Sequence, residues 1–204
     1  MPVHSNPHSA KITPQEMQDI INTSYQRGKP ESLSKYGLAY QPELSDKEQQ
    51  VYLDAKGKPI VAFRGSTLHN LGKDWWSSDV ALALGLEKYN PRFQKSEKLI
   101  QDVTERFGKP VTTVGHSLGG SLAEYANPTG KNITLNKAVG LGQILKPVSS
   151  KSVDIRAAQD IVSYGEKFQK GNQRKIEIPR TGHIISPLIS HDVKLLSRLP
   201  NKRI

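Results

Sequence analysis

A glycine-rich segment around Ser117 constrains the fold more than any other part of the sequence. It reads Gly115-His116-Ser117-Leu118-Gly119-Gly120, with the short β-branched stretch Val111-Thr112-Thr113-Val114 before it and small residues that favour a helix after it. Glycines at these spacings remove side chains that would collide where a helix crosses the strand leading into it. The segment therefore predicts a nucleophile elbow, a sharp strand-to-helix turn with the Ser117 hydroxyl at its tip. An ordinary glycine-rich turn with a solvated serine is the alternative interpretation.

Strand and helix signals alternate along the rest of the chain. Thr13-Pro14-Gln15-Glu16 combines a capping box with a proline at the first helical position, and Asn90-Pro91 opens a second helix. Alternation of this kind is typical of a mostly parallel sheet with helices on both faces. We therefore expect an α/β fold in one compact domain over residues 13–204, preceded by a flexible lead-in over residues 1–12. The expected strands are 49–53 and 59–63 (a hairpin), 111–114, 133–135, 153–156 and 175–179, and further helices begin near Leu118 and Val193.

Composition excludes several classes of protein. The 204 residues include no cysteine, which rules out disulfide scaffolds, zinc–thiolate sites and cysteine nucleophiles. No apolar run approaches the roughly 18–20 residues that a membrane-spanning helix needs. The N-terminus has no basic segment followed by an apolar one, so no secretory signal is visible and we expect an intracellular or virion-associated protein. Nothing in the sequence calls for a metal or another cofactor.

Positive charge is concentrated toward the C-terminus. The net charge is +10, and the last forty residues carry nine Lys or Arg against three Asp or Glu. Such a surface suits anionic phospholipid headgroups, nucleic acid or simple solubility, and charge alone does not choose among them. Nucleic-acid binding is disfavoured because only Tyr164 and Phe168 fall among the basic residues as stacking partners. The basic residues in question are Lys167, Lys170, Arg174, Lys175 and Arg180.

Two motifs in order resemble a known family. The class 3 (fungal-type) lipases have motifs similar to two stretches of this chain. One is Gly115–Gly120 followed by Ser121-Leu122-Ala123, and the other is the upstream stretch Val61-Ala62-Phe63-Arg64-Gly65-Ser66. Trp76-Ser77-Ser78-Asp79 is similar to the family's Trp-x-x-Asp motif. The resemblance covers roughly residues 50–195 and implies an α/β-hydrolase fold with a Ser, Asp, His order of catalytic residues.

The resemblance assigns roles to the residues that match these motifs. Ser117 would be the nucleophile, and Ser66 would supply an oxyanion donor beside the backbone N–H of Leu118. The Leu118 N–H also qualifies on physical grounds, because the N-terminus of a helix offers free N–H groups to a negative charge. Trp75 and Trp76 fall where the family carries its lid, with Trp76 expected in the core and Trp75 as an exposed lipid anchor.

Two candidates remain for the acid and two for the base. Asp160 follows a strand, where an acid can meet a histidine, whereas Asp154 lies within the strand and is expected on an exposed face. His191 directly precedes the last predicted helix, as the family's histidine commonly does, and His183 lies in a loop. We favour Asp160 and His191.

These residues predict a serine hydrolase that cleaves carboxylic esters of lipids, of lipase or phospholipase type. Its substrate would be a lipid ester, with peripheral contact to an anionic phospholipid surface, and no cofactor is expected. A soluble thioesterase or carboxylesterase of the same fold is one alternative. A catalytically inactive, lipase-like basic protein that binds nucleic acid, a membrane or an assembly partner is the other. The sequence leaves the oligomeric state open.

Overall fold

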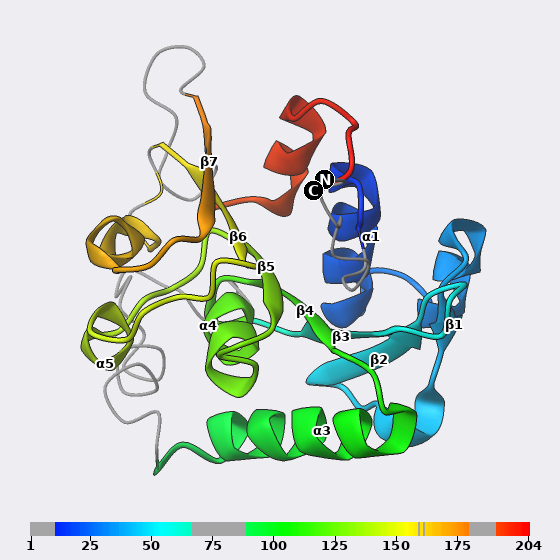
Figure 1. Cartoon of the computed structure of the whole chain (residues 1–204). Coiled ribbons are helices and arrows are strands. Elements are labelled where there is room, and N and C mark those ends of the chain that lie inside the picture. Colours follow the sequence, from blue (N-terminus) through cyan, green and yellow to red (C-terminus); the bar gives the residue numbers. More distant parts are fainter. Residues whose placement is uncertain (1–10, 67–88, 159, 161, 180–190) are drawn as a thin grey trace, which may run out of the picture.

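A twisted sheet runs through the centre of the protein. The computed structural model describes residues 11–66, 89–158, 160, 162–179 and 191–204. Within these residues the sheet has seven strands that lie side by side in chain order, antiparallel from β1 to β3 and parallel from β3 to β7 (Figure 1). The strands are β1 (Ala39–Tyr40), β2 (Gln49–Leu53), β3 (Pro59–Phe63), β4 (Thr112–His116), β5 (Lys131–Leu135), β6 (Val153–Ala157) and β7 (Arg174–Ile178). The prediction of a mostly parallel α/β fold is confirmed.

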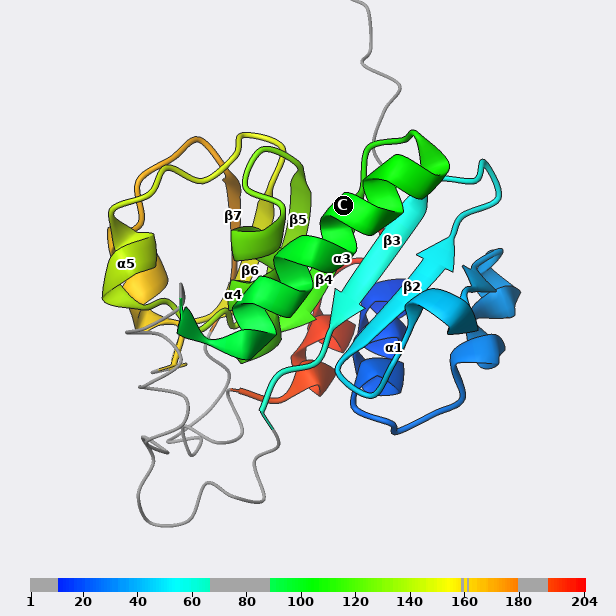
Figure 2. The same ribbon diagram turned by 90° about the horizontal axis from the view of Figure 1, so that it is seen from below.

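Helices cover both faces of this sheet. Figures 1 and 2 show α3 and α4 on one face and α1 with η6 on the other. The α-helices are α1 (Pro14–Ser24), α3 (Pro91–Phe107), α4 (Leu118–Ala126) and the short α5 (Leu141–Ile144). The 3-10 helices are η1 (Pro30–Tyr36), η2 (Pro42–Leu44), η5 (Tyr164–Phe168) and η6 (Val193–Arg198).

The two faces carry separate hydrophobic cores because side chains alternate along each strand. On β3, Ile60 and Ala62 join the core beneath α1 and η6, whereas Val61 and Phe63 join the core beneath α3 and α4. The predicted capping box of α1 is present, with the Glu16 N–H donating to the Thr13 side chain and the Thr13 N–H to the Glu16 carboxylate. Ile12 is buried in the first core, and residues 1–10 of the predicted lead-in lie outside the described residues.

The parallel register brings several chain segments to one edge of the sheet. Phe63 on β3 pairs with Gly115 on β4, and His116 pairs with Leu135 on β5. Parallel strands in register end at the same edge, where α/β folds place their sites. The segments that follow β3, β4 and β6 therefore leave the sheet on the side that carries residues 64–66, Ser117 and Asp160. No helix among the described residues is long and apolar enough to cross a membrane.

Helix α4 crosses β4 with backbone against backbone. A β-carbon at Gly115 would overlap the carbonyl group of Gly119 in the first turn of α4. A β-carbon at Gly119 would overlap the carbonyl oxygen of Phe63 at the end of β3. The contacts that these glycines make possible fix α4 against the ends of two strands.

This packing predicts a large stability difference between two glycine substitutions. Gly115→Ala forces backbone atoms apart, so we expect the free energy of unfolding to fall by about 1–3 kcal/mol or more. Gly28→Ala is the control, because its new β-carbon would only reach the Thr23 Cγ2 at 3.6 Å. That variant should stay within about 0.5 kcal/mol of the wild type. Urea unfolding followed by circular dichroism measures both, and equal effects would contradict the packing described.

Candidate active site

Ser117 occupies a strained backbone conformation at the junction of β4 and α4. Its φ of 57° and ψ of −128° lie in a region that residues with side chains rarely adopt. Hydrogen bonds on both sides hold it there. The Ser117 N–H donates to the Leu135 carbonyl at 3.1 Å, and the Ser117 carbonyl accepts from the N–H groups of Gly120 at 3.0 Å and Ala138 at 3.2 Å. Strain that the surroundings maintain in this way is typical of functional sites.

The start of α4 and the end of β3 lie against each other beside Ser117. The first N–H groups of a helix, here including that of Leu118 at the start of α4, have no acceptor within the helix. A β-carbon at Gly119 would lie 2.9 Å from the Gly65 nitrogen, which places the 64–66 segment against this helix start. Ser66 follows directly and is half-buried.

Arg64 holds this segment through its backbone. The Arg64 N–H donates to the Glu48 carbonyl at 2.9 Å, and the Arg92 guanidinium donates to the Arg64 carbonyl at 2.5 Å. The Arg64 side chain reaches toward the Lys47 carbonyl at 3.5 Å and is exposed there. Its suggested ion-pair partner, Asp79, lies outside the described residues.

Asp160 and His191 form a buried hydrogen-bonded pair. His191 Nδ1 lies 2.9 Å from Asp160 Oδ1, and the two residues are 2% and 1% exposed. The Asp160 carboxylate also accepts from the backbone N–H groups of Val162 at 3.3 Å and Ser163 at 3.0 Å. A carboxylate that accepts from Nδ1–H leaves His191 Nε2 as a lone-pair acceptor for another proton. This is the arrangement in which a histidine acts as a base.

His116, the last residue of β4 and the neighbour of Ser117, contacts His191. The two imidazole centroids are 4.6 Å apart, and His116 Nε2 lies 2.7 Å from the His191 carbonyl oxygen. A carbonyl only accepts, so Nε2 carries the proton and the Tyr25 hydroxyl donates to His116 Nδ1 at 3.0 Å. Burial, together with His191, lowers the pKa of His116 well below its ordinary value, so the ring is neutral. The motif shows His116 in the sequence but not these two partners.

Asp154 has a different role from the one its position suggested. The prediction of an exposed strand face is wrong, because Asp154 is 0% exposed. It lies 3.0 Å from the Lys137 ammonium and accepts from the Thr134 hydroxyl at 2.8 Å. Lys137 also contacts Glu124 of α4 at 2.5 Å. Burial alone would lower the pKa of Lys137, but these two carboxylates raise it above its ordinary value.

This buried network lies beneath α4 and could not be read from the sequence. A β-carbon at Gly120 would lie 3.1 Å from the Lys137 Cβ, so the lysine stem passes directly under the helix that begins at Leu118. Asp154 thus stabilises the position of α4, whereas Asp160 meets the histidine.

Four residues singled out in the sequence fall in segments that the structure does not describe. His183, Trp75, Trp76 and Arg180 lie outside the described residues. Among the described residues, no group of three or more His, Asp or Glu side chains could hold a metal ion.

The network predicts a stability loss at Asp154. Asp154→Ala leaves Lys137 with one buried carboxylate fewer, so we expect the free energy of unfolding to fall by about 3–5 kcal/mol. Asp102→Ala removes an exposed carboxylate on α3 and should change it by no more than about 0.5 kcal/mol. Urea unfolding at neutral pH compares the two. An Asp154→Ala variant as stable as the wild type would contradict the buried ion pair.

The low pKa of His116 predicts an acid-sensitive fold. The unfolded chain binds a proton at this histidine near pH 6.5, but the folded chain does not, so stability falls as the pH drops below that value. We expect His116→Gln to lose less stability than the wild type between pH 7 and pH 5, whatever its stability at pH 7. Unfolding free energies at the two pH values test this, and parallel losses would count against a neutral, buried His116.

Comparisons with known proteins place the chain in a family. A family model for the Tle-like phospholipase domain matches residues 8–165, which include Ser117 and Asp160. Among solved structures, a triacylglycerol lipase from Penicillium expansum is 14% identical, with 82% of this chain and 78% of that chain covered and a TM-score of 0.44. Lip2 lipase from Yarrowia lipolytica is also 14% identical, with 90% and 85% covered and a TM-score of 0.45. No protein with a curated description matches significantly. On the match of the family model, the chain belongs to the phospholipase-like family that carries the Tle-like phospholipase domain.

Proposed function

We propose that this protein is a serine hydrolase that cleaves carboxylic ester bonds of lipids, with Ser117, His191 and Asp160 as its catalytic triad. The observation that carries the proposal is the buried contact of 2.9 Å between His191 Nδ1 and Asp160. It directs the lone pair of Nε2 away from Asp160, on a histidine whose ring lies beside His116, the residue that precedes the strained Ser117. Membership of a phospholipase-like family supports a lipid ester as the substrate.

The geometry supports acyl transfer to water in two steps. His191 Nε2 takes the proton of the Ser117 hydroxyl as its oxygen attacks the ester carbonyl, and Asp160 stabilises the imidazolium that forms. The N–H of Leu118 and a donor from Ser66 bind the oxyanion. His191 then returns the proton to the leaving alcohol, which breaks the ester bond and leaves an acyl group on Ser117. Water, deprotonated by His191, releases the carboxylic acid.

The lid region belongs to the same proposal. Trp75 and Trp76 follow the 64–66 segment in the sequence, where the class 3 lipases carry their lid, and both lie outside the described residues. We assign Trp76 to the core and Trp75 to the lipid interface, because an indole ring buries an apolar body while its N–H stays in contact with polar groups. Rates on esters below and above their critical micelle concentration distinguish this enzyme from a soluble esterase, which would show no jump.

Labelling with a fluorophosphonate probe tests the triad. We expect the wild type to be labelled, Ser117→Ala to lose all labelling, and His191→Ala to react about 10⁴-fold more slowly or worse, because the serine loses its base. Asp160→Asn should show a loss of about 10⁴-fold, since the histidine then holds the wrong tautomer.

Two further variants serve as controls. His183→Ala should label at the wild-type rate, and Asp154→Asn should label normally at temperatures where circular dichroism shows it folded. Loss of labelling in His183→Ala with full labelling in His191→Ala would move the base to His183. A folded wild type that never labels, with or without detergent, would rule out the enzyme and leave the inactive basic protein.

A further inference from the structure

Two large hydrophobic side chains stand in solvent on neighbouring segments. Among the described residues only three large hydrophobic side chains are well exposed, and two of them are Leu145 at 81% and Phe168 at 58%. Leu145 follows α5, and Phe168 ends η5. Exposed apolar groups that lie together usually mark a contact surface.

Hydrogen bonds hold these two segments side by side. The Gln169 side-chain amide donates to the Gln143 carbonyl at 3.4 Å, and the Val148 N–H donates to the Lys170 carbonyl at 3.0 Å. Val148 also forms a β-bridge with Gly171. Figure 1 shows the coil of α5 next to the gold turn of η5, on the side of the sheet that ends in β7.

The same surface is positively charged. Lys146, Lys167 and Lys170 are exposed on these two segments, whereas Glu166, the acid between them, is only 2% exposed. Residues 143–148 and 165–171 therefore present lysines and apolar side chains with no exposed carboxylate. We call Leu145, Lys146, Lys167, Phe168 and Lys170 the docking patch.

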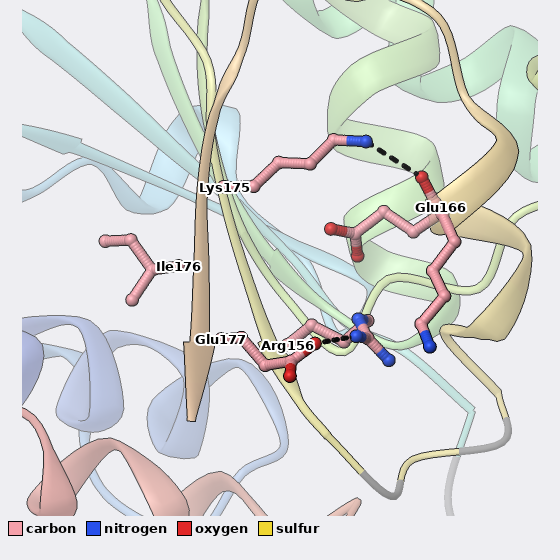
Figure 3. Close-up of a pocket in the computed structure, with 6 residues that line it drawn as sticks. Arg156, Glu166, Lys175, Ile176 and Glu177 are labelled. Carbon is pink, nitrogen blue, oxygen red and sulfur yellow. Dashed lines mark hydrogen bonds and ion pairs between the residues drawn. The ribbon is translucent and has the colours of Figure 1, made fainter. Parts of the chain in front are cut away.

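A small cavity beside the docking patch is lined by both cations and carboxylates. It has a volume of about 70 Å³, and its lining consists of Arg156, Glu166, Lys167, Lys175, Ile176 and Glu177 (Figure 3). Arg156 pairs with Glu177 through Nη2, while its buried Nη1 has no hydrogen-bond partner among the residues that the structure describes.

We propose that the docking patch binds membranes rich in anionic phospholipids, with Leu145 and Phe168 inserted among the lipids and the three lysines on the headgroups. This inference rests on the proposed function, since a docked enzyme would meet its ester substrate in that membrane. Apolar anchors ringed by lysines are the pattern that peripheral proteins use on such surfaces.

Two other occupants fit the patch less well. A second copy of the chain in a two-fold contact would set the patch against itself and oppose three lysines with three lysines. Nucleic acid would use the lysines and could stack on Phe168, but it gives Leu145 no partner.

Sedimentation with vesicles of ether-linked lipids tests docking without ester cleavage. The vesicles contain phosphatidylcholine alone or with phosphatidylglycerol, and we expect the wild type to bind only the second kind. Lys146→Gln/Lys167→Gln/Lys170→Gln should weaken binding about 100-fold, since each lysine near an anionic surface contributes about a fivefold factor. Leu145→Ser/Phe168→Ser should also weaken it. The matched control, Lys47→Gln/Lys98→Gln/Lys202→Gln, loses the same charge from other exposed positions and should lose much less binding.

The outcomes separate this inference from the proposed function. All variants should keep wild-type fluorophosphonate labelling, because none changes the triad. A wild type that labels but does not bind the anionic vesicles would overturn the docking patch alone. Equal binding by the two lysine variants would also overturn it. So would a dimer in solution that Leu145→Ser/Phe168→Ser dissociates, in the absence of vesicle binding, because the patch would then belong to a second copy.

Discussion

Helix α4 can cross β4 at backbone distance only because no side chain stands between them. Gly115 and Gly119 provide that space, and a β-carbon on either would overlap a carbonyl group. The crossing forces the chain to reverse within one residue, and Ser117 adopts a positive φ as a result. The same crossing presses the start of α4 against the 64–66 segment. Both the position of Ser117 and the access to the first N–H groups of α4 therefore depend on it.

Buried polar contacts hold this turn in place on both faces of the sheet. On the α4 face, Lys137 lies between Glu124 and Asp154 and links the helix to β6. On the opposite side, Tyr25 of the first helical segment contacts His116, which in turn contacts the main chain of His191. Buried polar networks with satisfied partners make a structure rigid. Here they connect the elbow to α1, β6 and the segment that carries the histidine.

The elements that the sequence predicted well are those with local signals. The capping box at Thr13, the asparagine cap before Pro91 and the glycines of the elbow each act within a few residues, and the structure has a helix at each. Asp154 illustrates what a local pattern cannot supply. The alternation of side chains along β6 predicts on which face of the sheet Asp154 lies. Whether solvent reaches that face depends on Lys137 and Glu124, which belong to other parts of the chain.

The candidate site also combines residues that the sequence could indicate with contacts that it could not. Order along the chain left two acids and two histidines as candidates, and the family resemblance favoured Asp160 and His191, whose side chains lie 2.9 Å apart in the structure. The contacts of His116 with Tyr25 and with the His191 carbonyl join residues 91 and 75 positions apart, and no sequence spacing points to them. The exposed pair Leu145 and Phe168 likewise becomes a surface only when α5 and η5 pack side by side.

In the proposed mechanism, Ser117 carries the acyl group during turnover. A water-soluble nitrophenyl ester, mixed with the protein and quenched in acid after one turnover, traps the covalent intermediate for mass spectrometry of the peptides. We expect one acyl group per chain, located on Ser117, and none on the Ser117→Ala variant. Release of nitrophenol without any acylated peptide, or an acyl group on another residue, would contradict it.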